Sequence, residues 1–460
     1  MSTTLIPPPE GKGRFARGIH PPDNKHWSGQ KRVSVLEDPE EVQVPLLQHI
    51  GAVAVLHVRP NSQIDAGGLL AEAEGMVSAP IHASIAGKVG RPSKTTLPNS
   101  RRVDAVKISR NPEAPSRGHE LWSKLSASLW NPEAAVSFSS CEILDRIRAA
   151  GIVGMGGATF PTYVKLKPNP AKPVKRLLVN GCECEPYLTA DARLMEEAAG
   201  AVVVGALCAA RACGAYRIDV AVEDNKPEAI AALKAAAENT WVRIRKVETK
   251  YPMGGEKQMI RAVYDRVIPD GGLPLDVGVA VINVSTAAAI AMAVIHQAPL
   301  THRIVSVTGP GIVEPRNLFT PVGSSFAHLV AACGGLKPET RRIISGGPMM
   351  GFTVPSLDVT VTKGVSGILA LTETSVPQGG ETACLRCGRC TDACPLNLVP
   401  ARIVQSTRHR RFDLAKRNHI LTCMECGCCA YACPAGIPLV QWIRAGKAEV
   451  RKAAPPKGGQ

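Results

Sequence analysis

The stretch that decides the fold of the central part of the chain is GIVGMGGATFP, residues 151–161, followed by KRLLVNGCECEPY, residues 175–187. The first segment has four glycines in seven positions, so its backbone amides can approach a phosphate closely. The second begins as a buried strand and opens into polar side chains. Ligands of α/β sheets bind beyond the carboxyl ends of strands, so Asn180, Glu183 and Glu185 can accept hydrogen bonds from ribose hydroxyls or a flavin ring. The stretch therefore predicts a Rossmann-like α/β domain.

A helix is predicted directly before the glycine loop. Ser139 and Glu142 have the spacing of a capping box, and the apolar residues of 141–150 recur at helical intervals up to Gly151. Lys165 follows the loop closely enough to reach the same phosphate. Glycine-rich loops are often plain turns, and this one matches neither the dinucleotide fingerprint nor the P-loop pattern.

Two further segments belong to the same domain. MGGEK, residues 253–257, opens a predicted helix over 256–266, whose amino terminus suits an anionic ligand or is an ordinary helix start. Residues 277–298 carry no charge and approach the length of a membrane span. Their polar residues favour a buried strand over 277–284 and then a helix capped by Ser285.

Eight of the fifteen cysteines form two runs with the pattern C-x2-C-x2-C-x3-C-P, at residues 384–395 and 423–434. A disulfide scaffold is excluded because the cytosol, where we expect the chain, keeps thiols reduced. Two such runs separated by 28 residues are typical of a two-cluster ferredoxin module. Structural zinc is the alternative, but it takes four ligands and would leave cysteines without a place.

In such modules the fourth cysteine of each run ligates the other cluster. The expected ligand sets are Cys384, Cys387, Cys390 and Cys433 for one [4Fe-4S] cluster, and Cys423, Cys426, Cys429 and Cys394 for the other. Cys428 has no place in either set and is predicted to pack in the interior. Cys182 and Cys184 form a C-x-C that is either a metal pair or, as we favour, two small packing residues.

The composition of the 460 residues excludes several classes of protein. With 45% hydrophobic residues, the chain can bury several cores and is not disordered as a whole. Its 42 glycines and 37 prolines exclude a long coiled coil. The amino-terminal residues lack the apolar core of an export signal, so a cytosolic location is expected.

The net charge of +15 is concentrated at the carboxyl end. Residues 378–460 hold 13 Lys and Arg against 5 Asp and Glu, which indicates either an acidic partner or a solvated basic surface. A nucleic-acid-binding module with RHRR, residues 408–411, as its contact is a further alternative. A nucleic-acid-binding function would leave the glycine loop, residues 151–161, and the acidic loop, residues 180–187, without a role. We therefore expect no nucleic acid partner.

The motifs above resemble known families. GIVGMGGATFPTYVK, residues 151–165, and VNGCECEPYL, residues 179–188, are similar to the loops that hold FMN in the flavin- and NADH-binding subunit of respiratory complex I. The chain resembles still more closely the C subunits of Rnf complexes, which are ion-pumping ferredoxin:NAD oxidoreductases. That family also has GIHPP-x-x-K, here residues 18–25, a GGEKQ element, here residues 254–258, and tandem cluster motifs. The resemblance covers most of residues 15–440.

This resemblance implies roles for twelve residues. Those expected to hold FMN are Gly154, Gly156, Gly157 and Lys165 at its phosphate, Asn180 and Glu183 at its ring and ribityl chain, Gly255 and Glu256 beside them, and Asn283 and Thr286 completing the site. Phe160 would stack on NADH, and Glu185 would bind its ribose. The chain departs from complex I at Cys182 and Cys184, which replace Asp and Ser, and at Lys257, which replaces a second Glu. These departures leave the ring contacts open.

An α/β multidomain fold is expected, with a Rossmann-like flavin domain, a β-grasp domain, an N-terminal β-sandwich-like domain and a helical two-cluster module. The boundaries are 1–120 for the sandwich, 130–298 for the flavin domain, 300–370 for the β-grasp domain, 378–445 for the cluster module and 446–460 for a disordered tail. The sandwich resembles lipoyl and biotinyl carriers but lacks their lysine between Met76 and Ala83, so a structural or docking role is expected. GGPMMG, residues 346–351, is predicted to turn against the flavin domain.

The function implied by the resemblance is electron exchange between NAD(H), FMN and two [4Fe-4S] clusters, with flavin as the two-to-one electron converter. The chain would be a peripheral subunit at the cytoplasmic face of the inner membrane. Its partners would be membrane subunits and ferredoxin or another acidic electron carrier. A soluble cobalamin reductase of the same family is the alternative.

Overall fold

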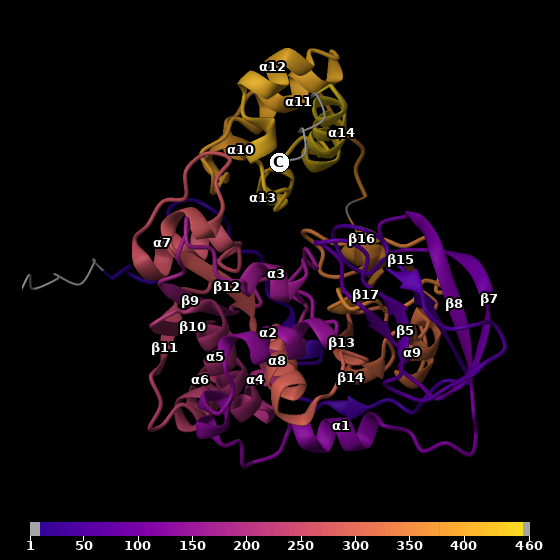
Figure 1. Ribbon diagram of the computed structural model, residues 1–460. Coiled ribbons are helices and arrows are strands. Elements are labelled where there is room, and N and C mark those ends of the chain that lie inside the picture. The colour runs from indigo at the N-terminus through magenta and orange to yellow at the C-terminus, as the bar shows by residue number, and fades with distance from the viewer. Residues whose placement is uncertain (1–9, 377, 454–460) are drawn as a thin grey trace, which may run out of the picture.

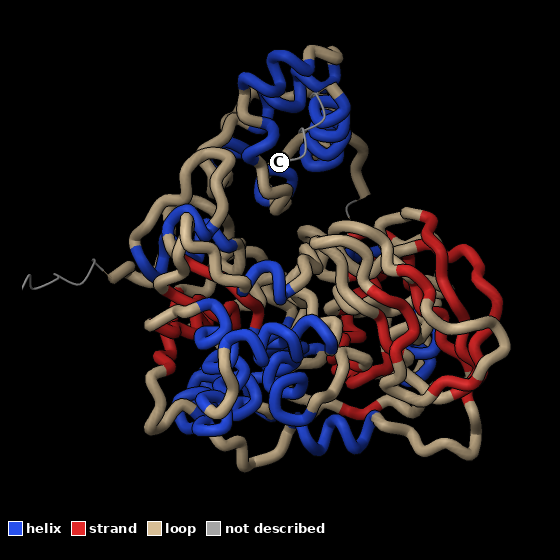
Figure 2. Tube along the Cα trace, viewed as in Figure 1, coloured by secondary structure: helices blue, strands red, loops and turns tan. Residues whose placement is uncertain are grey.

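A parallel sheet forms the centre of the flavin domain in the computed structural model, which describes residues 10–376 and 378–453 (Figures 1 and 2). In spatial order its strands are β11 (Val242–Val247), β10 (Arg217–Glu223), β9 (Arg176–Gly181) and β12 (Val279–Asn283). The chain builds the sheet outward from β9 to β11 and then adds β12 on the other side of β9. Such a reversal opens a crevice at the carboxyl ends of the two strands.

Helices cover both faces of this sheet. They are α2 (Ser140–Ala149), α3 (Thr162–Leu166), α4 (Ala190–Glu197), α5 (Ala199–Cys213), α6 (Pro227–Ala236), α7 (Glu256–Tyr264) and α8 (Val284–His296). Leu177 and Val179 share one core with α5 and α8, whereas Leu178 packs with α7. The alternation follows from the two-residue period of a strand. At Gly205 a Cβ atom would lie 1.7 Å from the Ala287 oxygen, so glycine allows α5 and α8 to touch.

The amino-terminal domain consists of two small antiparallel sheets around one core. One sheet contains β2 (Glu41–Pro45), β8 (Arg102–Arg110), β7 (Gly87–Thr96) and β4 (Gln63–Ile64), and the other contains β3 (Val55–Leu56), β5 (Leu69–Glu72) and β6 (Ile81–His82). Val42, Leu70, Ile85 and Ile108 are fully buried between them. This arrangement agrees with the predicted sandwich.

A mixed six-stranded sheet forms the domain that follows the flavin domain. Its strands in spatial order are β1 (Ser34–Val35), β14 (Arg316–Pro321), β13 (His302–Thr308), β17 (Gly367–Thr372), β15 (Thr340–Ser345) and β16 (Phe352–Thr353). Helix α9 (Phe326–Ala332) buries Phe326 and Leu329 in its core. Strand β1 belongs to the amino-terminal segment and pairs with β14. It also contacts α1 (Gly118–Leu125), so this segment connects the sheet to the rest of the chain.

The cluster module is helical and lies above α7 in the view of Figure 1. Its helices are α10 (Arg389–Asp392), α11 (Pro400–Arg408), α12 (Phe412–Arg417), α13 (Cys428–Tyr431) and α14 (Leu439–Lys452). Because α14 continues to Lys452 and buries Val450, the prediction of a tail beginning at residue 446 is wrong for this part. Residues 454–460 of that predicted tail lie outside the described residues.

The uncharged segment 277–298 forms β12 and α8, as expected, but its helix is capped differently. The Asn283 side chain accepts a hydrogen bond from the Ser285 amide, so Asn283 and not Ser285 is the cap. Both residue types cap helices well, and the shorter strand decides between them. Within the described ranges, no helix has the length and apolar character needed to cross a membrane.

Candidate functional site

The glycine loop lies against the end of β12, at the crevice where the strand order reverses. A Cβ atom at Gly156 would come within 2.9 Å of the Asn283 Cβ atom, so the contact requires glycine. The Met155 amide donates a hydrogen bond of 2.9 Å to the Thr286 hydroxyl. Gly157 has φ +136° and no neighbour within 4 Å of its Cβ position, so its backbone is open to a ligand.

The acidic loop after β9 contacts the later GGEK loop. The Asn180 side chain donates to the Gly254 oxygen at 2.9 Å and accepts from the Cys182 amide at 3.1 Å. The Gly254 amide donates to the Cys184 sulfur at 3.3 Å. Cys182 is buried, and burial raises its thiol pKa well above the ordinary value. Both cysteines of the C-x-C therefore serve packing and loop contacts in this structure.

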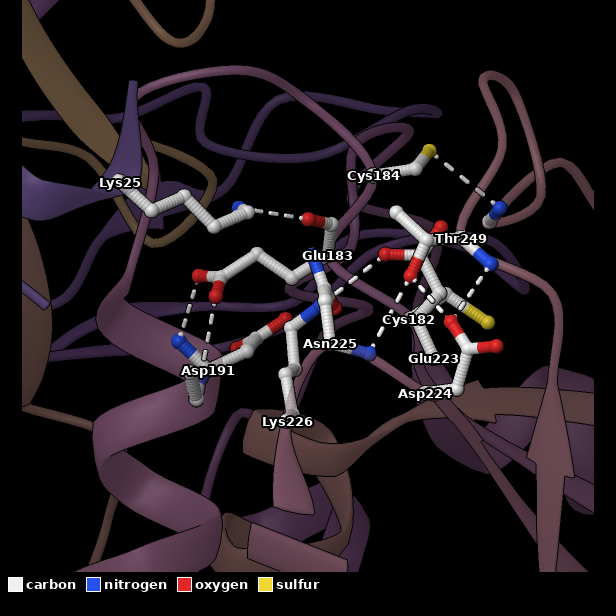
Figure 3. Close-up of polar contacts among 12 residues, drawn as sticks. Lys25, Cys182, Glu183, Cys184, Asp191, Glu223, Asp224, Asn225, Lys226 and Thr249 are labelled. Atoms are coloured by element: carbon white, nitrogen blue, oxygen red, sulfur yellow. Dashed lines mark hydrogen bonds and ion pairs between the residues drawn. The ribbon is translucent and has the colours of Figure 1, made fainter. Parts of the chain in front are cut away.

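Glu183 fastens the acidic loop to a helix (Figure 3). Its φ is +46°, and its carboxylate accepts from the amides of Asp191 and Ala192 at 2.7 and 3.1 Å, at the start of α4. Burial raises the Glu183 pKa, while the nearby Lys25 ammonium opposes this shift. The sequence predicted flavin contact for this residue, and the structure adds a loop-fixing role.

Lys25 of the GIHPPDNK segment holds the same loop. Its buried ammonium donates to the carbonyl oxygens of Glu183, Glu185 and Leu188 at 2.9, 3.2 and 2.5 Å. Burial lowers the Lys25 pKa. The sequence singled out this motif without assigning it a role, because the loop it contacts is 158 positions away.

Glu185 lies where three domains meet. Its carboxylate accepts from the Met349 and Met350 amides at 3.1 and 2.9 Å, and the Tyr251 hydroxyl oxygen lies 3.4 Å from it. Burial raises the Glu185 pKa to about 7. The prediction that GGPMMG turns against the flavin domain is confirmed. An ionised carboxylate has about four acceptor positions, so this one retains room for a ribose hydroxyl.

The predicted phosphate-side residues are partly paired with each other. The Lys165 ammonium lies 3.1 Å from a Glu256 carboxylate oxygen and 3.0 Å from the Val281 carbonyl oxygen. Because both charged side chains are partly exposed, the pair can open to an anionic group. Lys165 comes from α3 and Glu256 from the first turn of α7.

Asp191 is a site residue that the sequence analysis missed. Its carboxylate accepts from the Asn283 amide and the Ser285 hydroxyl, each at 2.6 Å. It thereby joins α4 to the start of α8 beneath the glycine loop. The signal was an aspartate in the first turn of the helix after the acidic loop, but many helices begin with such a residue.

The structure places together the residues that were predicted to hold FMN and NADH. They are Gly154, Gly156, Gly157, Phe160, Lys165, Asn180, Glu183, Glu185, Gly255, Glu256, Asn283 and Thr286, on the glycine loop, the acidic loop, the GGEK loop and the start of α8. Exposed glycine backbone, an open lysine–glutamate pair and amide side chains suit a phosphate and a polar ring. These residues fit FMN, while their individual contacts remain predictions.

One predicted cluster set surrounds a cavity. Cys394, Cys423, Cys426 and Cys429 line it, together with Cys428, Pro395 and apolar residues of α11 and α14. Three of the four predicted ligands come from the second run and Cys394 from the first, which agrees with the crossed pattern. Across residues 10–376 and 378–453, no three His, Cys, Asp or Glu side chains meet closely enough to hold a single metal ion. Cysteines spaced around a cavity suit a cubane cluster, which is larger than a tetrahedral zinc ion.

The other predicted set lies nearer the surface. Cys384 and Cys387 are exposed, and Cys390 and Cys433 are half-buried. The Thr382 amide donates to the Ala435 oxygen at 2.9 Å, which brings the start of the first run beside the end of the second. This contact is compatible with the crossed set that includes Cys433.

The enclosed set adjoins the flavin-domain loops. The Tyr251 hydroxyl donates to the Cys426 carbonyl oxygen at 2.7 Å, and the Gln258 side chain donates to the Pro395 oxygen at 3.4 Å. The Met424 methyl group lies 2.6 Å from the position of a Cβ at Gly255. The cysteines of the enclosed set are therefore next to the candidate flavin site, and those of the other set lie nearer the surface.

Four family models match successive parts of the chain. They are the RnfC barrel sandwich hybrid domain at residues 13–113, the Nuo51 FMN-binding domain at 147–292, the SLBB domain at 304–353 and the 4Fe-4S dicluster domain at 383–437. A solved NAD+-reducing [NiFe]-hydrogenase in its H2-reduced state covers 74% of this chain and 67% of its own, with 19% identity and a TM-score of 0.50. That likeness concerns the fold alone.

Curated relatives match almost the whole chain. The C subunit of the proton-translocating ferredoxin:NAD+ oxidoreductase complex of Clostridium ljungdahlii is 42% identical, covering 95% of this chain and 94% of its own. Its counterpart in the Na+-translocating complex of Acetobacterium woodii is 40% identical, covering 95% and 97%. The counterpart in the ion-translocating oxidoreductase complex of Rhodobacter capsulatus is 39% identical, covering 94% and 82%. The chain belongs to the family of C subunits of ion-translocating ferredoxin:NAD+ oxidoreductase complexes, the Rnf family.

Proposed function

We propose that this chain is the NAD(H)- and flavin-handling subunit of an ion-translocating electron transport complex. It exchanges electrons between NAD(H), FMN and two [4Fe-4S] clusters. The observation that supports this most directly is the contact between the two halves of the chain, in which Tyr251 of the flavin domain bonds to the Cys426 backbone. Redox centres that exchange electrons must lie close together, and this contact brings one cysteine set to the flavin loops.

Different residues of the crevice bind different parts of FMN. The glycine-loop amides and Lys165 hold the phosphate of FMN, and Asn180, Asn283 and Thr286 hold its polar chain and ring. FMN, when bound, takes two electrons with a hydride and passes them on singly. Glu256 receives the Lys165 ammonium when the phosphate is absent, which keeps that charge paired.

The nucleotide side of the site is formed by Phe160 and Glu185. Phe160 is half-buried at the end of the glycine loop, where a ring can stack on the nicotinamide or adenine. Glu185 accepts a hydrogen bond from a ribose hydroxyl at its free acceptor position. The Met349 and Met350 amides keep its carboxylate in place. The β-grasp domain therefore contributes to nucleotide binding by orienting Glu185.

The chain acts as a peripheral subunit at the cytoplasmic face of the inner membrane. It docks on the membrane subunits of its complex and exchanges electrons with ferredoxin or another acidic carrier, directly or through those partners. This placement is supported by the family of the chain and by the basic surplus of residues 378–460. The names of its relatives give no support to the cobalamin reductase alternative.

Composition and turnover test the proposal together. Protein purified without oxygen should contain acid-extractable FMN and about eight iron atoms per chain, the content of two cubanes. It should also reduce an artificial acceptor with NADH. Zinc in place of iron, or the absence of any NADH oxidation by fully loaded protein, would overturn the proposed function.

A further inference from the structure

The two cysteine runs form an internal repeat with matching backbones. CLRCGRCTDACP, residues 384–395, aligns without gaps with CMECGCCAYACP, residues 423–434. Gly388 and Gly427 have φ of 79° and 86° with ψ of −13° in both, and each precedes a helix of four residues. Positions that differ between two copies of one backbone reveal what each copy contacts.

The two runs differ at five positions, and three of these in the second run lie at the flavin domain or beside it. Met424 packs on Gly255, and Cys428 is fully buried with Tyr251 and Ile19. Glu425 pairs with Arg444 and Lys447 at 3.0 and 2.7 Å. Through this face of the second run, the enclosed cysteine set contacts the flavin domain.

In the first run, the equivalent positions are uncovered. Leu385, which corresponds to Met424, is 67% exposed. Arg386 and Arg389, which correspond to Glu425 and Cys428, are exposed and form no ion pair with any residue that the structure describes. The first run therefore presents the same face with an apolar centre and two unpaired arginines.

Elsewhere in the module, part of the positive charge is already paired. Arg408 pairs with Glu381, and Arg411 pairs with Asp413 at 3.4 Å. Two of the three arginines in the RHRR segment thus have partners within the module. The unpaired arginines beside the exposed cysteines are better placed to attract an external group.

We propose that Leu385, Arg386 and Arg389 form the docking face for an acidic redox protein. This inference rests on the proposed function and adds the place where electrons enter or leave. The repeat supports it, because two of the three equivalent positions in the second run, Met424 and Cys428, are covered by the flavin domain and the amino-terminal segment. Charge complementarity selects a partner whose redox centre is ringed by carboxylates. One electron crosses per encounter, so one centre is oxidised and the other reduced, and no bond is formed or broken.

Rapid mixing of the full, cofactor-loaded chain with two probes tests the proposal. The first probe is a reduced acidic two-cluster ferredoxin, which delivers electrons to the oxidised chain. The second is oxidised basic cytochrome c, which accepts one electron per molecule from the NADH-reduced chain. The variant Arg386→Glu with Arg389→Glu should slow the ferredoxin reaction about tenfold at low salt and accelerate the cytochrome reaction, because charge steers encounters.

The matched control is Lys416→Glu with Arg417→Glu, an equal charge change on exposed residues of α12. It should change either rate by less than about twofold. Equal slowing by both double variants, or no effect of the first, would overturn the docking face. If the glutamate variant loses iron, Arg386→Gln with Arg389→Gln and Leu385→Ala give the same comparison. Reduction of the flavin by NADH should stay unchanged in every variant, and its absence in the parent chain would instead count against the proposed function.

Discussion

At the scale of single residues, the candidate site depends on side chains that hold loops. Lys25 supplies three hydrogen bonds to the acidic loop from an amino-terminal segment, and Glu183 fastens the same loop to α4. Removal of Lys25 leaves carbonyl oxygens without a donor, and removal of the Glu183 carboxylate leaves two amides without an acceptor, which costs more than the bonds themselves contribute. The conformation of the loop is therefore a property of residues that do not need to touch a ligand.

The substitution Lys25→Met should weaken FMN binding strongly. It leaves the oxygens of Glu183, Glu185 and Leu188 without their donor, at a cost of about 2 kcal/mol or more, and frees the loop. Titration of the apoprotein with FMN should show a dissociation constant at least about tenfold higher. Lys31→Met, which removes a single bond to the Pro315 oxygen, is the control and should bind FMN normally. Equal binding by both variants would refute the role of Lys25.

Glu185 predicts a pH dependence of stability. Burial raises its pKa from 4.5 to about 7, so the folded chain holds this proton more tightly than the unfolded chain. Its contribution is therefore fully present below pH 4.5 and is lost as the pH rises through 7, by about 3 kcal/mol in total. Between about pH 5 and pH 8, the apparent melting temperature of the parent should fall relative to that of Glu185→Gln. The exposed Glu228→Gln should follow the parent, and parallel profiles for all three proteins would contradict the expected titration.

At the scale of elements, the sequence predicted the type and order of helices and strands better than the residues at which they begin and end. The capping box of Ser139 and Glu142 was correct because both signals lie within four residues. The cap of α8 was misplaced from Asn283 to Ser285, since adjacent good caps are distinguished only by where the strand ends. The predicted cluster module ended at residue 445, inside α14, because the final turns of this helix are rich in charge and pack through a single buried stripe.

The crossing of the two cysteine runs gives a prediction for the cluster module. Cys394 lies in the first run by sequence but lines the cavity with cysteines of the second, among them Cys423, Cys426 and Cys429. Cys394→Ala should therefore damage the same cluster as Cys426→Ala, and Cys433→Ala should damage the other. Electron paramagnetic resonance of the reduced variants can compare the surviving signals. If Cys394→Ala instead matches Cys387→Ala, each run ligates its own cluster.

At the scale of the whole molecule, contacts between distant segments explain what the sequence left open. Lys25 and Glu185 meet partners more than 150 positions away, so no local pattern could reveal these bonds. The resemblance to known motifs identified the loops, but not how they are braced. The GGPMMG turn contacts Glu185, and the amino-terminal segment around Ile19 pairs with the backbone of Tyr251. Both contacts lie next to the enclosed cysteines.

Tyr251 is one of the residues that join the flavin domain to the cluster module, and its hydroxyl can be removed alone. Tyr251→Phe deletes the bond to the Cys426 oxygen, worth about 1 kcal/mol, while the ring still fills its buried site. Hydrogen exchange of residues 17–25 and 250–258 should accelerate about fivefold, and cluster reduction by NADH should slow while flavin reduction does not. Tyr264→Phe, which loses an equally buried bond to Asp219 within the flavin domain, should leave both electron steps unchanged. If the two variants slow cluster reduction equally, the Tyr251 bond has no special part in joining the two redox domains.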